Sequence, residues 1–217
     1  MTGFQNEAGK PVLLAMVKAI QTNKDFLGEV DGLIGDGDHG MNMAKGFTLF
    51  ETRFGGEAFS FTEGLEELGT ILFSEIGGSM GPIYGSILMS MAEAGEGKEV
   101  IDLPVFAGML RAGLDGLCEI VDARVGDKTL VDTLTPAVET LEKAAASGQA
   151  FTAALADMKA AALAGRDSTK DLVAKFGRSS RLGERSRGVL DAGACSCYIL
   201  VEALADGITA LMEEEAK

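Results

Sequence analysis

The sequence predicts an all-α protein, a single domain built as a bundle of about eight antiparallel helices. Apolar residues recur with a period near 3.6 in almost every segment, which is the spacing of one helix face. No segment shows the alternating pattern of a convincing strand. The helices, of about 12 to 20 residues each, are joined by mostly short connections, which favour antiparallel neighbours.

The expected helices follow one another from the N-terminus. The first lies within 11–34, where Val12, Met16 and Ile20 share one face. The remaining apolar stripes span 43–54, 65–76, 83–91, 106–121, 134–141, 155–162 and 199–211. No composition shift marks a domain boundary, so we expect one domain over residues 1–217.

Composition narrows the function classes. The chain has 217 residues with 19 basic and 33 acidic side chains, and the net charge of −14 disfavours nucleic-acid binding. The N-terminus lacks the pattern of a signal peptide and no stretch approaches the length of a membrane span, so we expect a cytoplasmic protein without membrane contact. Cys118, Cys195 and Cys197 form no C-x-x-C pair, so neither a disulfide framework nor a zinc site is supported.

The connection "GLIGDGDHGMNMAKG" at 32–46 contains G-x-G-x-x-G, the pattern of a dinucleotide-binding turn. That turn requires a preceding strand, whereas the segment before it is helical in its spacing. Asp36 and Asp38 also occupy positions where two carboxylates would repel a bare pyrophosphate. A dinucleotide turn is therefore not expected.

Three aspartates in this region indicate a metal instead. Asp31, Asp36 and Asp38 offer hard oxygen ligands, which suit Mg²⁺ bound together with phosphate. The pattern does not match a calcium-binding loop, because Met41 would occupy the position that requires glycine. His39, the only histidine, stands beside Asp38, where its ring could donate a hydrogen bond to phosphate. From spacing alone, a magnesium-bridged phosphate site and an ordinary solvated turn both stay open.

Two further connections combine glycine with groups that bind anions. "GGSMGP" at 77–82 leads into a helix with Pro82 in its first turn, where free backbone N–H groups form an anion site. "GDKT" at 126–129 adds Lys128 and the Thr129 hydroxyl. Ordinary helix capping is the simpler interpretation of this second connection taken alone.

The longest connection runs from about residue 174 to 193 and is basic in an otherwise acidic chain. It carries Arg178, Arg181, Arg185 and Arg187 among glycines and serines. Compact domains seldom contain a structureless loop of about 18 residues unless it serves a function. We expect a mobile lid that closes over a bound anion and excludes water.

Four motifs together resemble a known family. "DGLIGDGDHGMNMAKGF", "GGSMGPIYG", "VGDKTLVDTLTPA" and "GRSSRLGERSRGVLDAGA" occur in the order and spacing of the nucleotide-binding L subunit of two-component dihydroxyacetone kinases. The resemblance covers roughly residues 10–212, nearly the whole chain. It implies a barrel of eight antiparallel helices with ATP or ADP and Mg²⁺, expected as two ions, at one end.

The resemblance also implies site residues. By position, Asp31, Asp36 and Asp38 match the magnesium ligands of the family. The expected nucleotide and lid contacts are His39, Gly40, Met41, Asn42, Ser79, Met80, Gly126, Thr129, Arg178, Asp191, Ala192 and Gly193.

The activity that the resemblance implies is phosphoryl transfer to dihydroxyacetone or a related ketose. The ketose is held on a separate K subunit, so this chain is expected to be active only with that partner. Alternatives are ADP as a permanent cofactor, recharged by a phosphohistidine protein of the sugar phosphotransferase system, and a nucleotide-bound coregulator of a transcription factor. The oligomeric state, including a homodimer, stays open.

Two positions depart from the family pattern. Met80 stands where the family commonly has serine, which removes a hydroxyl contact. Ala192 stands where the family usually has proline, which leaves that turn less restricted. We therefore expect nucleotide exchange to be faster than in members that retain ADP.

Overall fold

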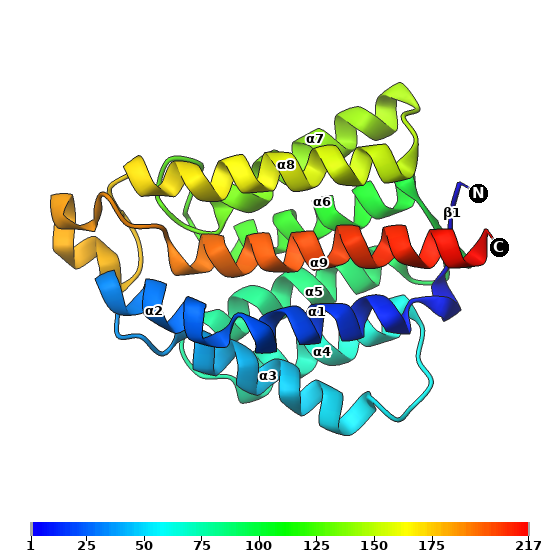
Figure 1. Cartoon of the computed structure of the whole chain (residues 1–217), viewed down its shortest axis with the longest axis horizontal. Helices are drawn as coiled ribbons and strands as arrows, with labels where there is room; N and C mark the ends of the chain where they lie inside the picture. Colours follow the sequence, from blue (N-terminus) through cyan, green and yellow to red (C-terminus); the bar gives the residue numbers. More distant parts are fainter. Residues whose placement is uncertain (1, 217) are drawn as a thin grey trace.

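The computed structural model describes residues 2–216, and most of them are helical. Figure 1 shows the long helices lying side by side, with both ends of the chain at the same end of the bundle. The nine α-helices of this described part are α1 (Lys10–Thr22), α2 (Lys24–Ile34), α3 (His39–Phe54), α4 (Phe61–Glu75), α5 (Met80–Gly95), α6 (Leu103–Ile120), α7 (Val131–Ser147), α8 (Phe151–Ser168) and α9 (Ala192–Glu215).

The helices close into a ring. Each of α4 to α8 packs against the next helix in sequence, α9 packs against α1, and α3 joins α1 to α4. The second helix, α2, packs on α3 and α9. In Figure 1, α9 runs between α8 and α1. The predicted all-α, barrel-like bundle is therefore confirmed.

The helix boundaries differ from the predicted ones in two ways. The first apolar segment breaks at Asn23, whose side-chain amide donates to the Ala19 carbonyl at 2.9 Å, so it forms α1 and α2. Ile76 and Val121, predicted to be helical, have extended backbones directly after α4 and α6. Because Ile76 is still buried, its side chain continues the apolar stripe although the helix has ended.

A short antiparallel pair of strands escaped the sequence analysis. Strand β1 (Gly3–Gln5) pairs with β2 (Val100–Asp102), with Phe4 opposite Ile101. Three residues are too few for an alternating pattern to be recognised. A Cβ added at Gly3 would lie 2.4 Å from the Ile101 carbonyl oxygen, so glycine allows the strands to approach. The remaining elements are the 3-10 helices η1 (Asn6–Ala8), η2 (Thr169–Asp171) and η3 (Arg178–Ser186).

Aromatic side chains fill the end of the barrel that holds β1. Phe4 meets Phe61 edge to face with ring centroids 5.3 Å apart, and the contacts continue to Phe106 at 6.4 Å and Phe151 at 5.9 Å. The last three lie in the first turns of α4, α6 and α8. Consequently α3, α5, α7 and α9 begin at the opposite end.

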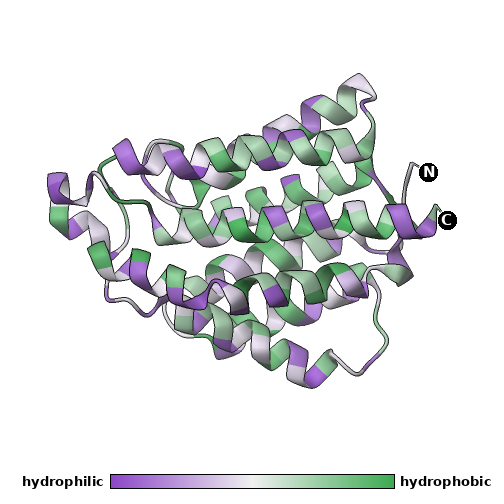
Figure 2. Cartoon of the chain, in the orientation of Figure 1, coloured by the Kyte–Doolittle hydropathy of each residue, from purple (hydrophilic) through white to green (hydrophobic). Residues whose placement is uncertain are grey.

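One described helix, α9, is long and apolar enough to cross a membrane by length and composition alone. The expectation that no stretch approaches this length is therefore wrong. The apolar composition of α9 is explained by its position in the core. It packs against α1, α2, α7 and α8, and 61% of its most apolar window is buried in the protein. A core helix passes the same test as a membrane span. Figure 2 shows hydrophobic and hydrophilic residues interspersed along the helices of the bundle.

Candidate functional site

Four helix N-termini surround one cavity at the end of the barrel away from β1. The first residues of α3, α5 and α9, and those just before α7, line this cavity of about 800 Å³. The helix dipole gives each such terminus a partial positive charge, and the start of α5 also lacks a side-chain cap for its N–H groups. Four termini converging on one space form an anion site.

The three aspartates stand at the edge of this cavity. Asp31 lies in the last turn of α2, Asp36 in the connection that follows, and Asp38 directly before α3. One carboxylate oxygen of each lies within 4.8 Å of those of the other two. The sequence singled out these residues, and the structure brings them together in an arrangement that could hold a metal ion.

The glycines of this connection serve close packing between α2 and α3. A Cβ added at Gly40 would lie 1.9 Å from the Lys24 carbonyl oxygen and 2.8 Å from the Gly28 amide nitrogen. Gly37 adopts a φ of 77°, which other residues rarely adopt. The G-x-G-x-x-G pattern therefore brings two helices, and with them the aspartates, close together.

The connection at 77–82 presents free amides to the cavity. Gly78 turns the chain with a φ of 75°, and no side chain caps the start of α5. Ser79 and Met80 both line the cavity. The predicted helix with Pro82 in its first turn is present.

The connection at 126–129 is arranged differently. The Gly126 and Thr129 amides donate to the two carboxylate oxygens of buried Asp132, at 2.6 and 2.8 Å. The Thr129 hydroxyl accepts from the Val131 amide at 3.2 Å. The amides of Gly126 and Thr129, two residues that the resemblance places among the nucleotide contacts, are thus paired with Asp132 in this structure.

The Lys128 side chain is also engaged in contacts within the protein. It is buried, and its ammonium group donates to the carbonyl of Thr169, which precedes the lid, and to that of Val189, near the end of the lid. Desolvation lowers the pKa of Lys128, against the attraction of Asp191. Lys128 therefore ties the ends of the lid together.

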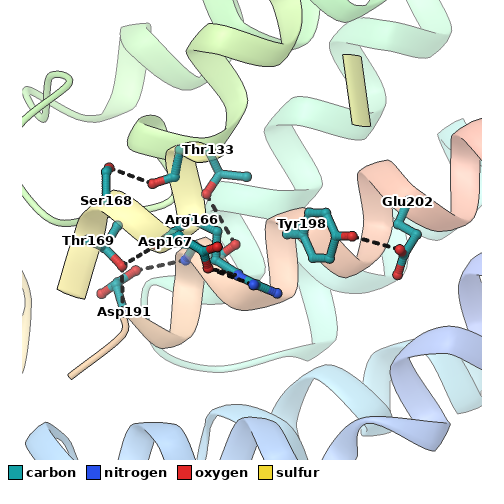
Figure 3. Close-up of polar contacts among 10 residues, drawn as sticks. Thr133, Arg166, Asp167, Ser168, Thr169, Asp191, Tyr198 and Glu202 are labelled. Carbon is teal, nitrogen blue, oxygen red and sulfur yellow. Dashed lines mark hydrogen bonds and ion pairs between the residues drawn. The ribbon is translucent and has the colours of Figure 1, made fainter. Parts of the chain in front are cut away.

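The lid folds back over the aspartates. Its helix η3 begins at Arg178, whose guanidinium forms an ion pair with Asp36. The base of the lid is held by the Asp191 amide, which donates to the Thr169 hydroxyl at 3.1 Å (Figure 3). Gly177 and Gly183 have positive φ on either side of η3's first half, which allows the chain to turn sharply there.

Most residues that the sequence predicted for the site line the cavity. Gly40, Met41 and Gly126 lie outside the lining. The predicted residues within it are Asp31, Asp36, Asp38, His39, Asn42, Ser79, Met80, Thr129, Arg178, Asp191, Ala192 and Gly193.

Burial also shifts the pKa values of His39 and Asp191, which line the cavity. Desolvation lowers the pKa of His39 to about 4, against the attraction of Asp31, so the ring is neutral at pH 7. Desolvation raises the pKa of Asp191 to about 6, although the Ala194 amide and Lys128 favour its charged form. The Asp191 carboxylate caps α9 by accepting from that amide at 2.8 Å.

Sequence reasoning missed two hydroxyl groups behind His39. The Ser196 hydroxyl lies 2.8 Å from His39 Nε2 and 2.6 Å from the Tyr84 hydroxyl. Both Ser196 and Tyr84 are buried on the core faces of their helices. A polar residue on an apolar helix face is the one signal that could have revealed them.

The family model of the DAK2 domain matches residues 33–206. The ADP-binding subunit DhaL of PEP-dependent dihydroxyacetone kinase 1 from Listeria innocua is 36% identical over 85% of this chain and 88% of its own length. The ADP-binding subunit DhaL of a PTS-dependent dihydroxyacetone kinase from Lactococcus lactis is 37% identical, with the same coverage.

Solved structures agree in fold. The dihydroxyacetone kinase of C. freundii in its native form superposes with a TM-score of 0.70 at 22% identity, over 95% of this chain. This chain spans 36% of that kinase chain. The same kinase solved with AMP-PNP and Mg²⁺ gives a TM-score of 0.67 at 20% identity. The helical barrel, the family model over most of the chain and the relatives of nearly equal length lead to one conclusion: the chain belongs to the DAK2 domain family.

Proposed function

We propose that this chain is the Mg-nucleotide-binding subunit of a kinase for dihydroxyacetone or a related ketose. The observation that carries the proposal is the convergence of four helix N-termini and three carboxylates on one cavity. The core residues of all nine helices form one hydrophobic cluster, which supports a single nucleotide-binding domain over residues 1–217. The proposal places the protein in the cytoplasm, where ATP is available.

The aspartates fit magnesium. Asp31, Asp36 and Asp38 provide only oxygen donors, which Mg²⁺ prefers, and leave room for phosphate oxygens to complete the coordination. We propose that they hold two Mg²⁺ ions. When bound, Mg²⁺ neutralises charge on the phosphate groups.

The residues of this chain bind and orient the phosphates. The first amides of α5, at Met80 and Gly81, and the Gly193 amide in the first turn of α9 offer fixed donors to phosphate oxygens. Arg178 lies where closure of the lid brings a positive charge to the nucleotide and excludes water. No nucleophile on this chain is required, since the ketose hydroxyl attacks the phosphoryl group directly.

The ketose is carried by a separate K subunit, which must cover the mouth of the cavity. Ile120 and Phe176 line this mouth and are 49% and 39% exposed. Exposed apolar side chains at a site of transfer fit a protein interface. Ile120→Glu is expected to abolish ketose phosphorylation with a K-type subunit while nucleotide binding persists. Val100→Glu, which alters a 40% exposed residue on β2 at the opposite end, is the matched control.

Two phosphoryl sources are compatible with this site. The first source is free ATP, which exchanges with the bound nucleotide. The second is a phosphohistidine protein of the sugar phosphotransferase system, which recharges ADP that stays bound. The names of the Listeria and Lactococcus relatives, PEP-dependent and PTS-dependent, favour the second source for this chain.

The nucleotide content of freshly purified protein tests the proposal. Denaturation followed by chromatography is expected to release ADP, and dialysis against EDTA or the change Asp36→Ala is expected to empty the site. Asp25→Ala, which alters an exposed aspartate on α2 outside the cavity, is the control and is expected to retain the nucleotide. Empty protein that binds added Mg-ATP would favour exchange over recharging. Protein that binds neither ADP nor ATP with Mg²⁺ would overturn the proposal.

A further inference from the structure

A chain of buried hydroxyl groups leads from the core to His39. The Tyr84 hydroxyl on α5, the Ser196 hydroxyl on α9 and His39 Nε2 at the start of α3 follow one another at 2.6 and 2.8 Å. Tyr84 is 3% exposed and Ser196 is fully buried. Three helices whose N-termini line the cavity are therefore joined through one serine hydroxyl.

One direction of these hydrogen bonds satisfies both short contacts and places the stronger donor first. Both hydroxyl groups also lie 3.1 Å from the Gly193 carbonyl oxygen, which is longer than the usual O–H···O range of about 2.5–3.0 Å. The two short contacts use both hydroxyl protons when Tyr84 donates to Ser196 and Ser196 donates to His39 Nε2. Phenol is the stronger acid of the two hydroxyl groups, so Tyr84 is the better donor to Ser196. Successive bonds in one direction polarise and strengthen one another.

This direction determines the form of the imidazole ring. A neutral histidine carries one proton, and the hydrogen bond at one nitrogen fixes which nitrogen holds it. With Ser196 donating to Nε2, the ring proton resides on Nδ1.

The other ring nitrogen, Nδ1, is available to a ligand in the cavity. Within the described residues Nδ1 makes no hydrogen bond to protein, and no fully buried side-chain nitrogen or oxygen there lacks a partner. Nδ1 is therefore accessible, and His39 lines the cavity. An N–H group at this place is positioned to donate to an anionic ligand in the cavity.

We propose that Tyr84 and Ser196 are positioning residues, which hold His39 as the Nδ1–H tautomer and direct that N–H toward a phosphate oxygen of the bound nucleotide. The phosphate part of this inference rests on the proposed function, whereas the tautomer does not. Neither residue touches the reacting atoms.

The single histidine makes the tautomer directly measurable. Protein labelled with nitrogen-15 histidine gives one imidazole, whose two nitrogen shifts and couplings to the ring protons distinguish the tautomers at neutral pH. The nucleotide-free wild type is expected to be the Nδ1–H form, and Ser196→Ala is expected to move it toward the Nε2–H form. A wild-type ring protonated on Nε2 would overturn the proposal, and this measurement requires no variant to fold.

The two tyrosines of the chain provide a matched pair for function. Tyr84→Phe removes the donor to Ser196, whereas Tyr198→Phe removes a hydroxyl that donates to Glu202 at 2.7 Å, further along α9 (Figure 3). Tyr84→Phe is expected to weaken Mg-ADP binding about tenfold, since a hydrogen bond to a charged group is lost or misdirected. Tyr198→Phe is expected to bind as the wild type does.

The outcomes separate the two proposals. An altered tautomer in Ser196→Ala or Tyr84→Phe with unchanged Mg-ADP affinity would overturn the contact with phosphate. A wild type with the Nδ1–H tautomer that binds no nucleotide would overturn the proposed function and leave the positioning of His39 supported.

Discussion

The guanidinium of Arg178 pairs with Asp36, so the lid of this protein rests on the same carboxylate cluster that is proposed to hold magnesium. Both partners are partly exposed, at 63% and 36% of their side-chain areas. In this closed arrangement the arginine supplies a positive charge where the cation would stand. A metal ion must therefore compete with the lid for Asp36.

Removing this arginine should strengthen metal binding in the absence of nucleotide. Arg178→Gln is expected to tighten Mn²⁺ binding by up to about fivefold, because exposed ion pairs contribute about 1 kcal/mol at most. Titration of nucleotide-free protein with Mn²⁺, followed by electron paramagnetic resonance, measures the change. Arg181→Gln, which alters a neighbouring lid arginine without an ion pair among the described residues, is the control. Equal affinities in the two variants would contradict the competition.

Packing at Gly40 should not tolerate a side chain. Gly40→Ala would push a methyl group into the Lys24 carbonyl and force α2 and α3 apart, at a cost of about 1–3 kcal/mol in the free energy of unfolding. Urea denaturation measures this cost. Gly56→Ala, at a glycine with no atom within 4 Å of an added Cβ, serves as the reference and should change stability little. Similar stability of the two variants would show that the helices can separate without cost.

The buried Asp191 should give stability a specific pH dependence. Burial raises the pKa of Asp191 to about 6, above its ordinary value, so the folded protein binds more protons than the unfolded chain between about pH 4 and pH 6. Stability from this group is thus highest at low pH and is lost as pH rises through 6. Asp191→Asn keeps an oxygen that caps α9 but cannot ionise.

Urea denaturation of both proteins at several pH values measures this effect. The stability of the wild type relative to Asp191→Asn is expected to fall by about 1–2 kcal/mol between pH 4 and pH 7. The other carboxylates titrate in both proteins and cancel in the difference. A constant difference over this range would show that Asp191 ionises without penalty.

Ala192 should control how quickly nucleotide leaves. It is the first residue of α9, a position that favours proline, and its amide makes no hydrogen bond to protein within the described residues. Ala192→Pro is expected to stabilise the fold by about 0.4–1 kcal/mol by restricting the unfolded chain. We also expect slower release of a fluorescent ADP analogue in stopped-flow measurements, and faster release from Ala192→Gly. Identical release rates in all three proteins would show that this turn does not control nucleotide release.

The helices and the aspartate cluster followed from local patterns, and the other cavity residues followed from the resemblance of four motifs to a known family, whereas the contacts between helices followed from neither. Gly40 and Asp38 could be recognised because their spacing lies within one connection. Ser196 could not, since its partners come from α3 and α5 and meet only after the barrel has closed. The resemblance assigned Gly126 to the nucleotide contacts, whereas its amide donates to Asp132, the second residue of α7.

The Gln5 amide donates to the Glu215 carboxylate, so the two ends of the described chain meet at the end closed by phenylalanines. The cavity opens at the far end of the barrel. An affinity tag, a fluorophore or a second folded unit attached beside residues 5 or 215 therefore leaves the mouth free. The protein can be immobilised on a surface through either attachment point with its cavity still exposed to a soluble partner, an orientation suited to force or surface-binding measurements.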